Sequence, residues 1–182
     1  MGFCHRKVIK VMDEKITIVD ANDVAIGGLE KLKVHQKGIL HRAFSIHVKN
    51  KGGQYMLQKR ADGKYHSAGL WTNTCCGHPR PGEDLDIAAH RRLREETGFD
   101  CIFKEVLVFH YMVHFQNGLL ENEILHVFVG QYDGKPVLNE KEVGDWKWML
   151  PEEISKDIKD NPDSYTYWYK IAFEKILSLG NY

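Results

Sequence analysis

Arg92, Glu95 and Glu96 carry charged groups at a spacing that could do chemistry together. In a helix, residues three and four positions apart lie on one face, so these side chains would point to the same place. Carboxylates there could hold a divalent cation, and a guanidinium could clamp an anion through two parallel hydrogen bonds. The simpler alternative is a solvated helix face with no ligand.

A second acidic pair, Glu121 and Glu123, alternates by two, so on a strand both carboxylates face the same side. The chain also has ten histidines. Histidine is the commonest metal ligand and the side chain that titrates nearest pH 7. These features indicate a metal site or a proton-transfer site without locating it.

The elements that must position these groups follow from hydrophobic periodicity. Leu85, Ala88, Ala89 and Leu93 recur at helical spacing, and Gly98 ends a predicted helix over residues 83–97. Further helices are expected from Pro151 and over residues 164–179. Strands are expected over residues 16–20, 24–29, 41–50, 54–60, 104–115, 122–132 and 145–150, with a hairpin turn at residues 51–53.

This order of strands and helices predicts an α/β (α+β) fold. The length of 182 residues suits one domain, so we expect a single domain over residues 1–182, with residues 1–14 as a flexible N-terminal segment. We find no secretory signal and no run of 18 apolar residues. The formal net charge is zero, which argues against nucleic acid and membrane partners. The four cysteines form no disulfide framework, which indicates a cytoplasmic protein.

The segment from Gly77 to Phe99 resembles the Nudix box, G-x5-E-x7-R-E-U-x-E-E-x-G-U, where U is aliphatic. Its spacing is matched by Gly77, Glu83, Arg91, Leu93, Glu95, Glu96 and Gly98, whereas Arg92 replaces a glutamate. The residues before the box, Trp71-Thr72-Asn73-Thr74-Cys75-Cys76-Gly77-His78-Pro79, resemble the W-T-N-x-x-C-G-H-P segment of type I isopentenyl-diphosphate Δ-isomerases, and that family has arginine at the position of Arg92.

Three further segments carry the same resemblance, which covers residues 16–173: Leu29-Glu30-Lys31 followed by His35, then residues 40–45, then residues 121–123. The resemblance implies a Nudix-like α/β/α sandwich with a central mixed sheet. It also implies a His₃Glu₂ site for Mn²⁺, Mg²⁺ or Zn²⁺, with His35, His41, His78, Glu121 and Glu123 as ligands. The spacing from His35 to His41 is one residue shorter than in some relatives. The other seven histidines, including His47 and His66, are interpreted as structural.

The family reaction is a 1,3-allylic shift of a double bond through a tertiary carbocation, which needs an acid and a base on opposite faces of the substrate. The resemblance assigns this pair to Cys76 and Glu123, with Tyr111 bound to the glutamate. A cation-rich setting is expected to lower the pKa of Cys76. Trp168 matches the family tryptophan that faces the carbocation, the alternative being core packing.

The resemblance also implies a diphosphate site. Basic family positions correspond to Lys31, Arg60, Lys64 and Arg92, and Ser45 could add a hydroxyl. A second Mg²⁺ would bridge the diphosphate to Glu96. The expected partner is therefore a small isoprenoid diphosphate, and a monomer is favoured.

Two other functions stay open at this point. The first is a Nudix diphosphohydrolase that acts on nucleotide or isoprenoid diphosphates, against which Arg92 and the Cys76/Glu123 pair argue. The second is a non-catalytic module that binds a metal or a partner, which would need no acid–base pair. The sequence does not say which of Cys76 and Glu123 supplies the proton.

Overall fold

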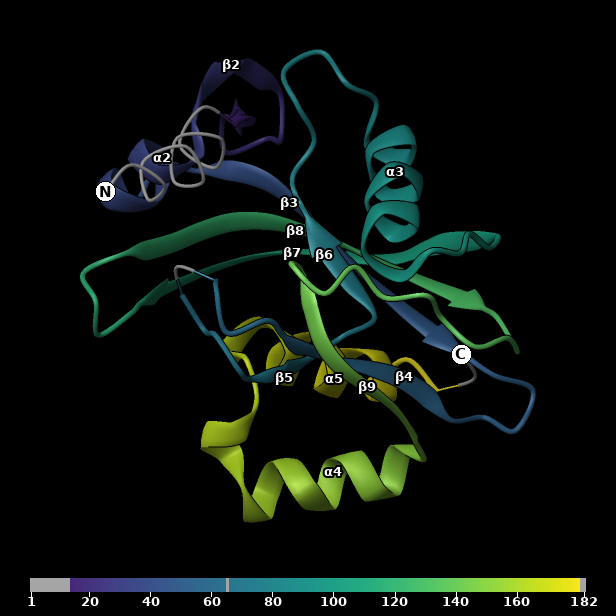
Figure 1. The fold of residues 1–182 in the computed structure, drawn as a ribbon. Helices are drawn as coiled ribbons and strands as arrows, with labels where there is room; N and C mark the ends of the chain where they lie inside the picture. The colour runs from purple at the N-terminus through teal and green to yellow at the C-terminus, as the bar shows by residue number, and fades with distance from the viewer. Residues whose placement is uncertain (1–13, 65, 181–182) are drawn as a thin grey trace, which may run out of the picture.

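The computed structural model describes residues 14–64 and 66–180. Within that part of the chain the strands are β1 (Lys15–Val19), β2 (Ala25–Glu30), β3 (His41–Lys49), β4 (Tyr55–Arg60), β5 (Trp71–Thr72), β6 (Cys75–Gly77), β7 (Phe103–His114), β8 (Leu120–Gln131) and β9 (Val143–Met149). The helices are α2 (Lys31–Lys37), α3 (Leu85–Thr97), α4 (Pro151–Asp160) and α5 (Tyr167–Ser178), with a 3₁₀ turn, η1 (Pro162–Ser164). Figure 1 shows their arrangement.

All the strands join one mixed sheet. Its main path runs β2-β1-β3-β4-β5, and β6 and β8 also pair with β3, β9 with β4 and β7 with β8. The β3–β8 pair is parallel, whereas the other pairs are antiparallel. The central strand β3 therefore lies next to several segments that are far apart in the sequence.

Helices cover both faces of this sheet (Figure 1). Because side chains alternate along β3, Phe44, Ile46 and Val48 pack in one core with Leu93 of α3, whereas Ala43 packs in a second core with residues of α4 and α5. The two cores confirm the expected α/β/α sandwich.

Helix α3 ends at Thr97 as expected and begins at Leu85, two residues later than expected, because Asp84 caps it. The side chain of Asp84 accepts hydrogen bonds from the backbone N–H groups of Asp86 and Ile87, and Gly98 ends the helix with φ 73°. A β-carbon at Gly98 would lie 2.6 Å from the carbonyl oxygen of Val137, so a larger residue would have no room there. These two ends fix the rotation of the helix face that carries Arg92 and Glu96.

Several elements differ from the expectation. The short helix α2 and the short strands β5 and β6 were not predicted, because segments of two to seven residues carry little periodicity. The last helix begins at Tyr167 rather than residue 164, because η1 takes the preceding residues. The expected N-terminal segment, with Cys4 and His5, lies outside the described residues apart from Glu14.

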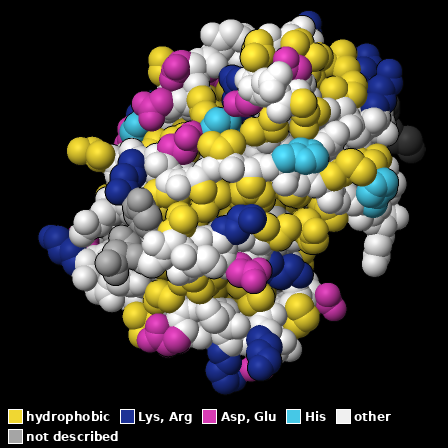
Figure 2. Space-filling model, turned by 180° about the vertical axis from the view of Figure 1, so that it is seen from behind, with side chains coloured by type: hydrophobic (Ala, Val, Ile, Leu, Met, Phe, Trp, Pro, Cys, Tyr) yellow, Lys and Arg dark blue, Asp and Glu magenta, His cyan; other side chains and the backbone are white. Residues whose placement is uncertain are grey.

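The surface agrees with the balanced composition. On the face shown in Figure 2, Lys and Arg side chains are interspersed with Asp and Glu side chains, and histidines lie among hydrophobic groups. In the described part of the chain, no helix is long and apolar enough to cross a membrane.

Candidate functional site

His35 and His41 flank a short connection between helix and strand. Helix α2 ends at Gly38, whose left-handed backbone (φ 61°) lets its N–H donate to the carbonyl of Val34, and β3 begins at His41. The Nδ1–H of His35 donates to the carbonyl of Lys31 at 2.6 Å, and that of His41 to the carbonyl of Ile39 at 2.9 Å. Both imidazoles therefore present Nε2 to the interior, so the shorter spacing between them still lets His35 reach the cluster.

Strand register brings the next groups together. His41 lies opposite Glu123 in the parallel β3–β8 pair, and Tyr111 lies opposite Glu123 in the β7–β8 pair. The Tyr111 hydroxyl donates to Glu123 Oε2 at 2.7 Å. Three neighbouring strands thus place an imidazole, a carboxylate and a phenol in one row across the sheet.

His78 reaches the same place from the turn after β6. Its Nε2 lies 3.0 Å from Glu123 Oε1. The preceding Gly77 packs tightly, because a β-carbon there would lie 3.0 Å from the Phe44 ring and 3.3 Å from the Arg92 side chain. A residue without a side chain lets this turn pass between β3 and α3.

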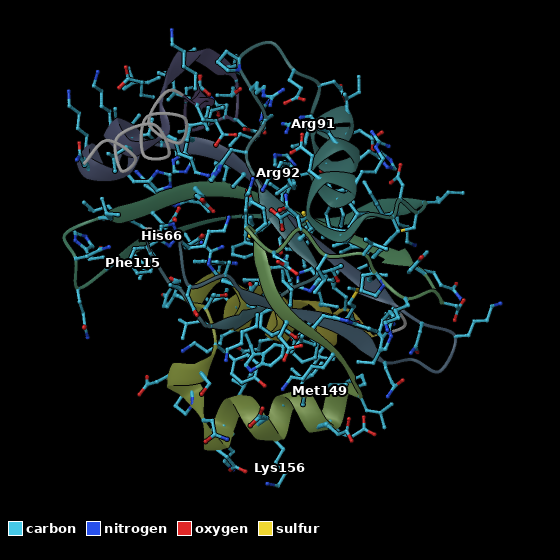
Figure 3. All side chains as sticks on the ribbon, viewed as in Figure 1. His66, Arg91, Arg92, Phe115, Met149 and Lys156 are labelled. Carbon is cyan, nitrogen blue, oxygen red and sulfur yellow. The ribbon has the colours of Figure 1, made fainter. Side chains whose placement is uncertain are left out.

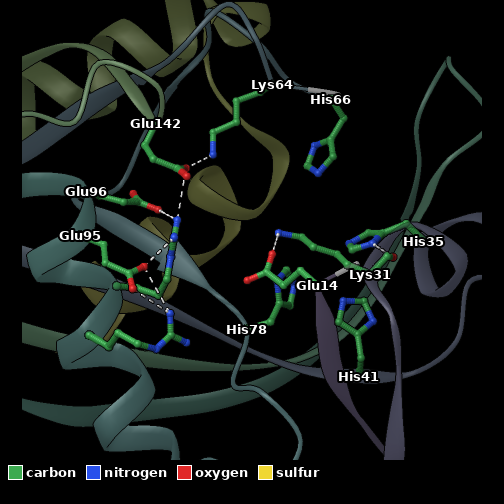
Figure 4. A network of polar contacts seen from close by, with 12 residues as sticks. Glu14, Lys31, His35, His41, Lys64, His66, His78, Glu95, Glu96 and Glu142 are labelled. Carbon is green, nitrogen blue, oxygen red and sulfur yellow. Dashed lines mark hydrogen bonds and ion pairs between the residues drawn. The ribbon is translucent and has the colours of Figure 1, made fainter. Parts of the chain in front are cut away.

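Five ligand-type residues converge on one point. One ligand atom from each of His35, His41, His78, Glu121 and Glu123 lies within 4.8 Å of the others. Glu121 Oε2 lies 3.3 Å from His35 Nε2 and 3.8 Å from His41 Nε2, and His41 Nε2 lies 3.2 Å from Glu123 Oε1. Figure 4 shows the three imidazoles together. We call these five residues the histidine cluster.

The donor chemistry of this cluster fits a divalent cation. Because Nδ1 of His35 already donates to a backbone carbonyl, a neutral His35 directs the Nε2 lone pair at a carboxylate oxygen, and the same holds for a neutral His41. Such facing acceptors need protons or a cation between them. Backbone carbonyls that orient imidazoles in this way are typical of metal sites.

Burial sets the protonation states of the cluster. Burial lowers the pKa of His35 to about 4, with a smaller contribution from His41, and burial holds the pKa of His78 well below its usual value. Burial and the neighbouring Glu123 raise the pKa of Glu121 well above the usual range. Burial would also raise the pKa of Glu123, but its close contacts with the imidazoles of His41 and His78 outweigh burial and hold that pKa well below normal. Neutral imidazoles beside an ionised carboxylate are ready to bind a metal.

A cavity open to solvent lies next to this cluster. Its walls include Cys76 from β6, Tyr111 from β7, Glu123 from β8 and Trp168 from α5. The backbone of Cys76 pairs with that of Ser45, which places Cys76 on the α5 side of the sheet, whereas Cys75 is buried on the α3 side. The structure thus places the four expected catalytic residues around one space.

The expected pKa change of Cys76 is wrong. Burial raises the pKa of its thiol, and the nearby Arg60 and Lys64 offset this only in part. Burial and the Glu123 carboxylate likewise raise the pKa of Tyr111 well above normal. Both side chains are therefore protonated at neutral pH, so each can donate a proton or a hydrogen bond.

The four expected cations, Lys31, Arg60, Lys64 and Arg92, also line the cavity. All but Arg60 contact a carboxylate: Lys31 contacts Glu14 at 3.6 Å, Lys64 pairs with Glu142, and Arg92 pairs with Glu96 and with Glu142 at 3.2 Å (Figure 4). The Arg60 guanidinium lies over the Trp168 ring, 5.3 Å from its centroid. A small anion that enters this end of the cavity therefore meets several positive charges.

The face of helix α3 that carries Arg92, Glu95 and Glu96 has an internal ion pair. Glu96 lines the cavity, but its Oε1 accepts from Arg92 and its Oε2 from Gln58. Arg92 also contacts Glu95 at 2.9 Å. The guanidinium thus neutralises both carboxylates that a hydrolase would use for metal. Arg91 pairs with Glu83 and does not line the cavity. Figure 3 shows Arg91 and Arg92 beside helix α3.

Two expectations about individual residues fail. Ser45 is fully buried, and its Oγ lies 2.9 Å from His47 Nε2 rather than on the cavity wall, because it is two residues deeper along β3 than Ala43. His66, interpreted from the sequence as structural, lines the cavity, and its Nε2 lies 3.2 Å from Glu121 Oε1. One indication in the sequence that His66 could line the site is that it follows Lys64, an expected diphosphate-binding residue, by two positions.

Comparison with known proteins agrees with this geometry. The NUDIX domain family matches residues 39–169. The isopentenyl-diphosphate Delta-isomerase 2 of Photorhabdus laumondii is 54% identical over 87% of this chain and 90% of that protein. Isomerase 2 of Aromatoleum aromaticum is 47% identical over 92% of this chain and 88% of that protein.

Solved structures show the same fold at low sequence identity. A crystal structure of DR0079 from Deinococcus radiodurans has a TM-score of 0.72 at 18% identity and covers 87% of this chain and 96% of that chain. A MutT protein from Methanosarcina mazei has a TM-score of 0.64 at 19% identity and covers 79% of this chain and 96% of that chain. Taken with the sequence relatives, this chain belongs to the NUDIX domain family and, within it, to the isopentenyl-diphosphate Delta-isomerases.

Proposed function

We propose that this protein is an enzyme that converts isopentenyl diphosphate to dimethylallyl diphosphate, by protonation at one carbon and deprotonation two carbons along. The observation that carries the proposal is the row of Cys76, Tyr111, Glu123 and Trp168 around one cavity that has cations at its edge. The relatives' names supply the substrate.

The chemistry needs two proton-transfer groups that face a flat apolar chain. The Glu123 carboxylate is the acceptor with the lowered pKa, and the Cys76 thiol is a buried group that keeps its proton. The Tyr111 hydroxyl donates to Glu123 Oε2 and so orients the carboxylate. A proton added at the terminal carbon and one removed two carbons along leave the overall composition unchanged.

The intermediate carbocation needs a wall that stabilises charge without reacting. Trp168 is 4% exposed and lines the cavity, so its indole can supply a cation–π contact of up to ~2 kcal/mol when desolvated. The chemistry also requires that water be kept from the cation, which water would trap as an alcohol.

The histidine cluster would hold a divalent cation, Mn²⁺, Mg²⁺ or Zn²⁺. When bound, such an ion fixes the Glu123 carboxylate and lowers its affinity for a proton. Lys31, Arg60, Lys64 and Arg92 would bind the diphosphate, and a second Mg²⁺ would join it to Glu96 once Arg92 turns from that carboxylate to the substrate. Ser45 has no part in this proposal.

We further place this chemistry in the cytoplasm, supported by the free thiols of Cys75, Cys76 and Cys101. The favoured monomeric state stays a prediction, which sedimentation of the purified protein would check.

The test is incubation of isopentenyl diphosphate with the enzyme and Mg²⁺ in D₂O. We expect dimethylallyl diphosphate that carries deuterium at the exchanged carbons. The same reaction is assayed for released phosphate and pyrophosphate, because release without isomerisation would instead support the hydrolase alternative. Absence of both the allylic product and deuterium exchange would refute the proposal.

A further inference from the structure

His66 joins the histidine cluster to the aromatic wall of the cavity. Its ring stacks on Phe115, with centroids 5.1 Å apart and an interplanar angle of 16°, and meets the Trp168 ring edge-on at 5.8 Å and 85°. Figure 3 shows His66 beside Phe115 at the β7–β8 end of the molecule. The imidazole is 9% exposed, so two aromatic rings in a buried setting fix its position.

The Glu121 carboxylate has different partners for its two oxygens. Oε2 faces the cluster, 3.3 Å from His35 Nε2 and 3.8 Å from His41 Nε2. Oε1 has a different neighbour, because His66 Nε2 lies 3.2 Å from it. Glu121 can therefore offer one oxygen to a cation while the other is held by an imidazole.

The other side of the His66 ring allows the tautomer that this arrangement needs. The Oγ of Ser67 lies 3.3 Å from His66 Nδ1. If the Ser67 hydroxyl donates to Nδ1, the proton of a neutral imidazole is on Nε2, which then donates to Glu121 Oε1. Ser67 has φ 51°, a conformation that non-glycine residues rarely adopt, so the fold keeps this hydroxyl beside the ring against a local preference.

We propose that His66 is a positioning residue that fixes the Glu121 carboxylate with Oε2 toward the three cluster histidines and so raises the affinity of the site for a divalent cation. This inference rests on the metal site of the proposed function. Outer hydrogen bonds of this kind keep a ligand carboxylate from rotating, and their loss typically weakens metal binding about 10- to 100-fold.

The experiment titrates Mn²⁺ into the chelator-stripped full chain and measures free Mn²⁺ by electron paramagnetic resonance. His66→Phe keeps a ring for the contacts with Phe115 and Trp168 but removes the donor, so we expect a dissociation constant about 10- to 100-fold higher. His66→Gln restores an N–H near the position of Nε2 and should recover part of the affinity. His90→Phe is the matched control, because His90 also stacks on a phenylalanine, Phe103, with centroids 4.1 Å apart, and should leave binding unchanged.

Each variant is accompanied by a thermal unfolding curve, and His66→Met replaces His66→Phe if the latter does not fold. A donor-free variant that binds Mn²⁺ within twofold of the wild type would overturn the inference. Equal losses in His66→Gln and the donor-free variant would also overturn it, because packing alone would then explain them. Because metal binding is read without turnover, an inactive wild type would count against the isomerase proposal and leave this result standing.

Discussion

At the histidine cluster the side chains come from the sheet, from helix α2 and from the loop after β6, and those of His35, His41, Glu121 and Glu123 are at most 6% exposed. At the opposite edge of the cavity, the cationic end, Lys64, Arg92 and Glu142 come from loops and helix α3 and are 17–23% exposed. Strand register and backbone carbonyls fix the first group, whereas mutual charge holds the second. The backbone fold therefore positions the ligands of the histidine cluster, whereas ion pairs between side chains position the charges of the cationic end.

The largest effect should follow from removing the groups that transfer the proton. Glu123→Gln keeps the size of the side chain but cannot accept a proton, so turnover should fall by about 10³-fold or more, and Cys76→Ala should do the same. Steady-state kinetics measure this, with Cys101→Ala as the control for a thiol outside the cavity. Near-normal rates in either variant would remove its residue from the mechanism.

Two buried histidines, His35 of the metal-free histidine cluster and His47 of β3 outside it, should make the protein sensitive to acid. The folded pKa of His35 is about 4 and that of His47 about 3, both lowered by burial, against ~6.5 in the unfolded chain. The unfolded chain therefore binds more protons below pH 6.5, and stability should fall between pH 6.5 and 4 by up to ~1.4 kcal/mol per pH unit for each buried histidine. Urea midpoints in chelator at pH 7.5, 5.5 and 4.5 check this, and an unchanged midpoint would contradict it.

A divalent cation should stabilise the histidine cluster more than an anion stabilises the cationic end. At a hundredfold excess over its dissociation constant, Mn²⁺ should add ~2.7 kcal/mol to the free energy of unfolding at pH 7.5. Pyrophosphate without metal should add less at the same concentration, because it must compete with Glu142 and Glu96. Urea unfolding measures both, and Glu121→Gln should remove most of the Mn²⁺ effect. A larger effect of pyrophosphate would reverse the comparison.

The two ends also differ in how far the sequence predicts them. The alternation of Glu121 and Glu123 and the amphipathic pattern of α3 are local, so they survive into the structure. The pairing of His41 with Glu123 joins strands 82 residues apart and depends on register, which the spacing along the chain does not show. The family resemblance predicted that contact. It did not predict the role of His66, which lies in a loop and reaches the cavity through contacts with Phe115 and Trp168 that are distant in the sequence.

At the cationic end, Arg92→Gln should raise KM about tenfold or more with a smaller change in kcat, because it removes one of the cavity charges that we propose bind the diphosphate. Arg91→Gln is the matched control, since Arg91 pairs with Glu83 and does not line the cavity. Steady-state kinetics with isopentenyl diphosphate separate the two parameters. An unchanged KM in Arg92→Gln would show that the other cations suffice to bind the anion.

The smallest effect should come from Glu142, which pairs with both Lys64 and Arg92. Burial raises its pKa, but these two cations outweigh that and lower it, so Glu142 is ionised at neutral pH. Glu142→Gln keeps an oxygen that accepts from both cations but removes the competing negative charge, so pyrophosphate should bind about threefold more tightly at low salt, and the gain should shrink at 0.5 M salt through screening.

Isothermal titration at two salt concentrations measures that gain, and Glu83→Gln, which alters the Arg91 pair instead, should leave it unchanged. Weaker binding in Glu142→Gln would mean that the carboxylate orients Lys64 and Arg92 more than it competes with the anion. The cationic end would then be as preorganised as the histidine cluster. Ion pairs would position its side chains, as strand register positions His41 and Glu123.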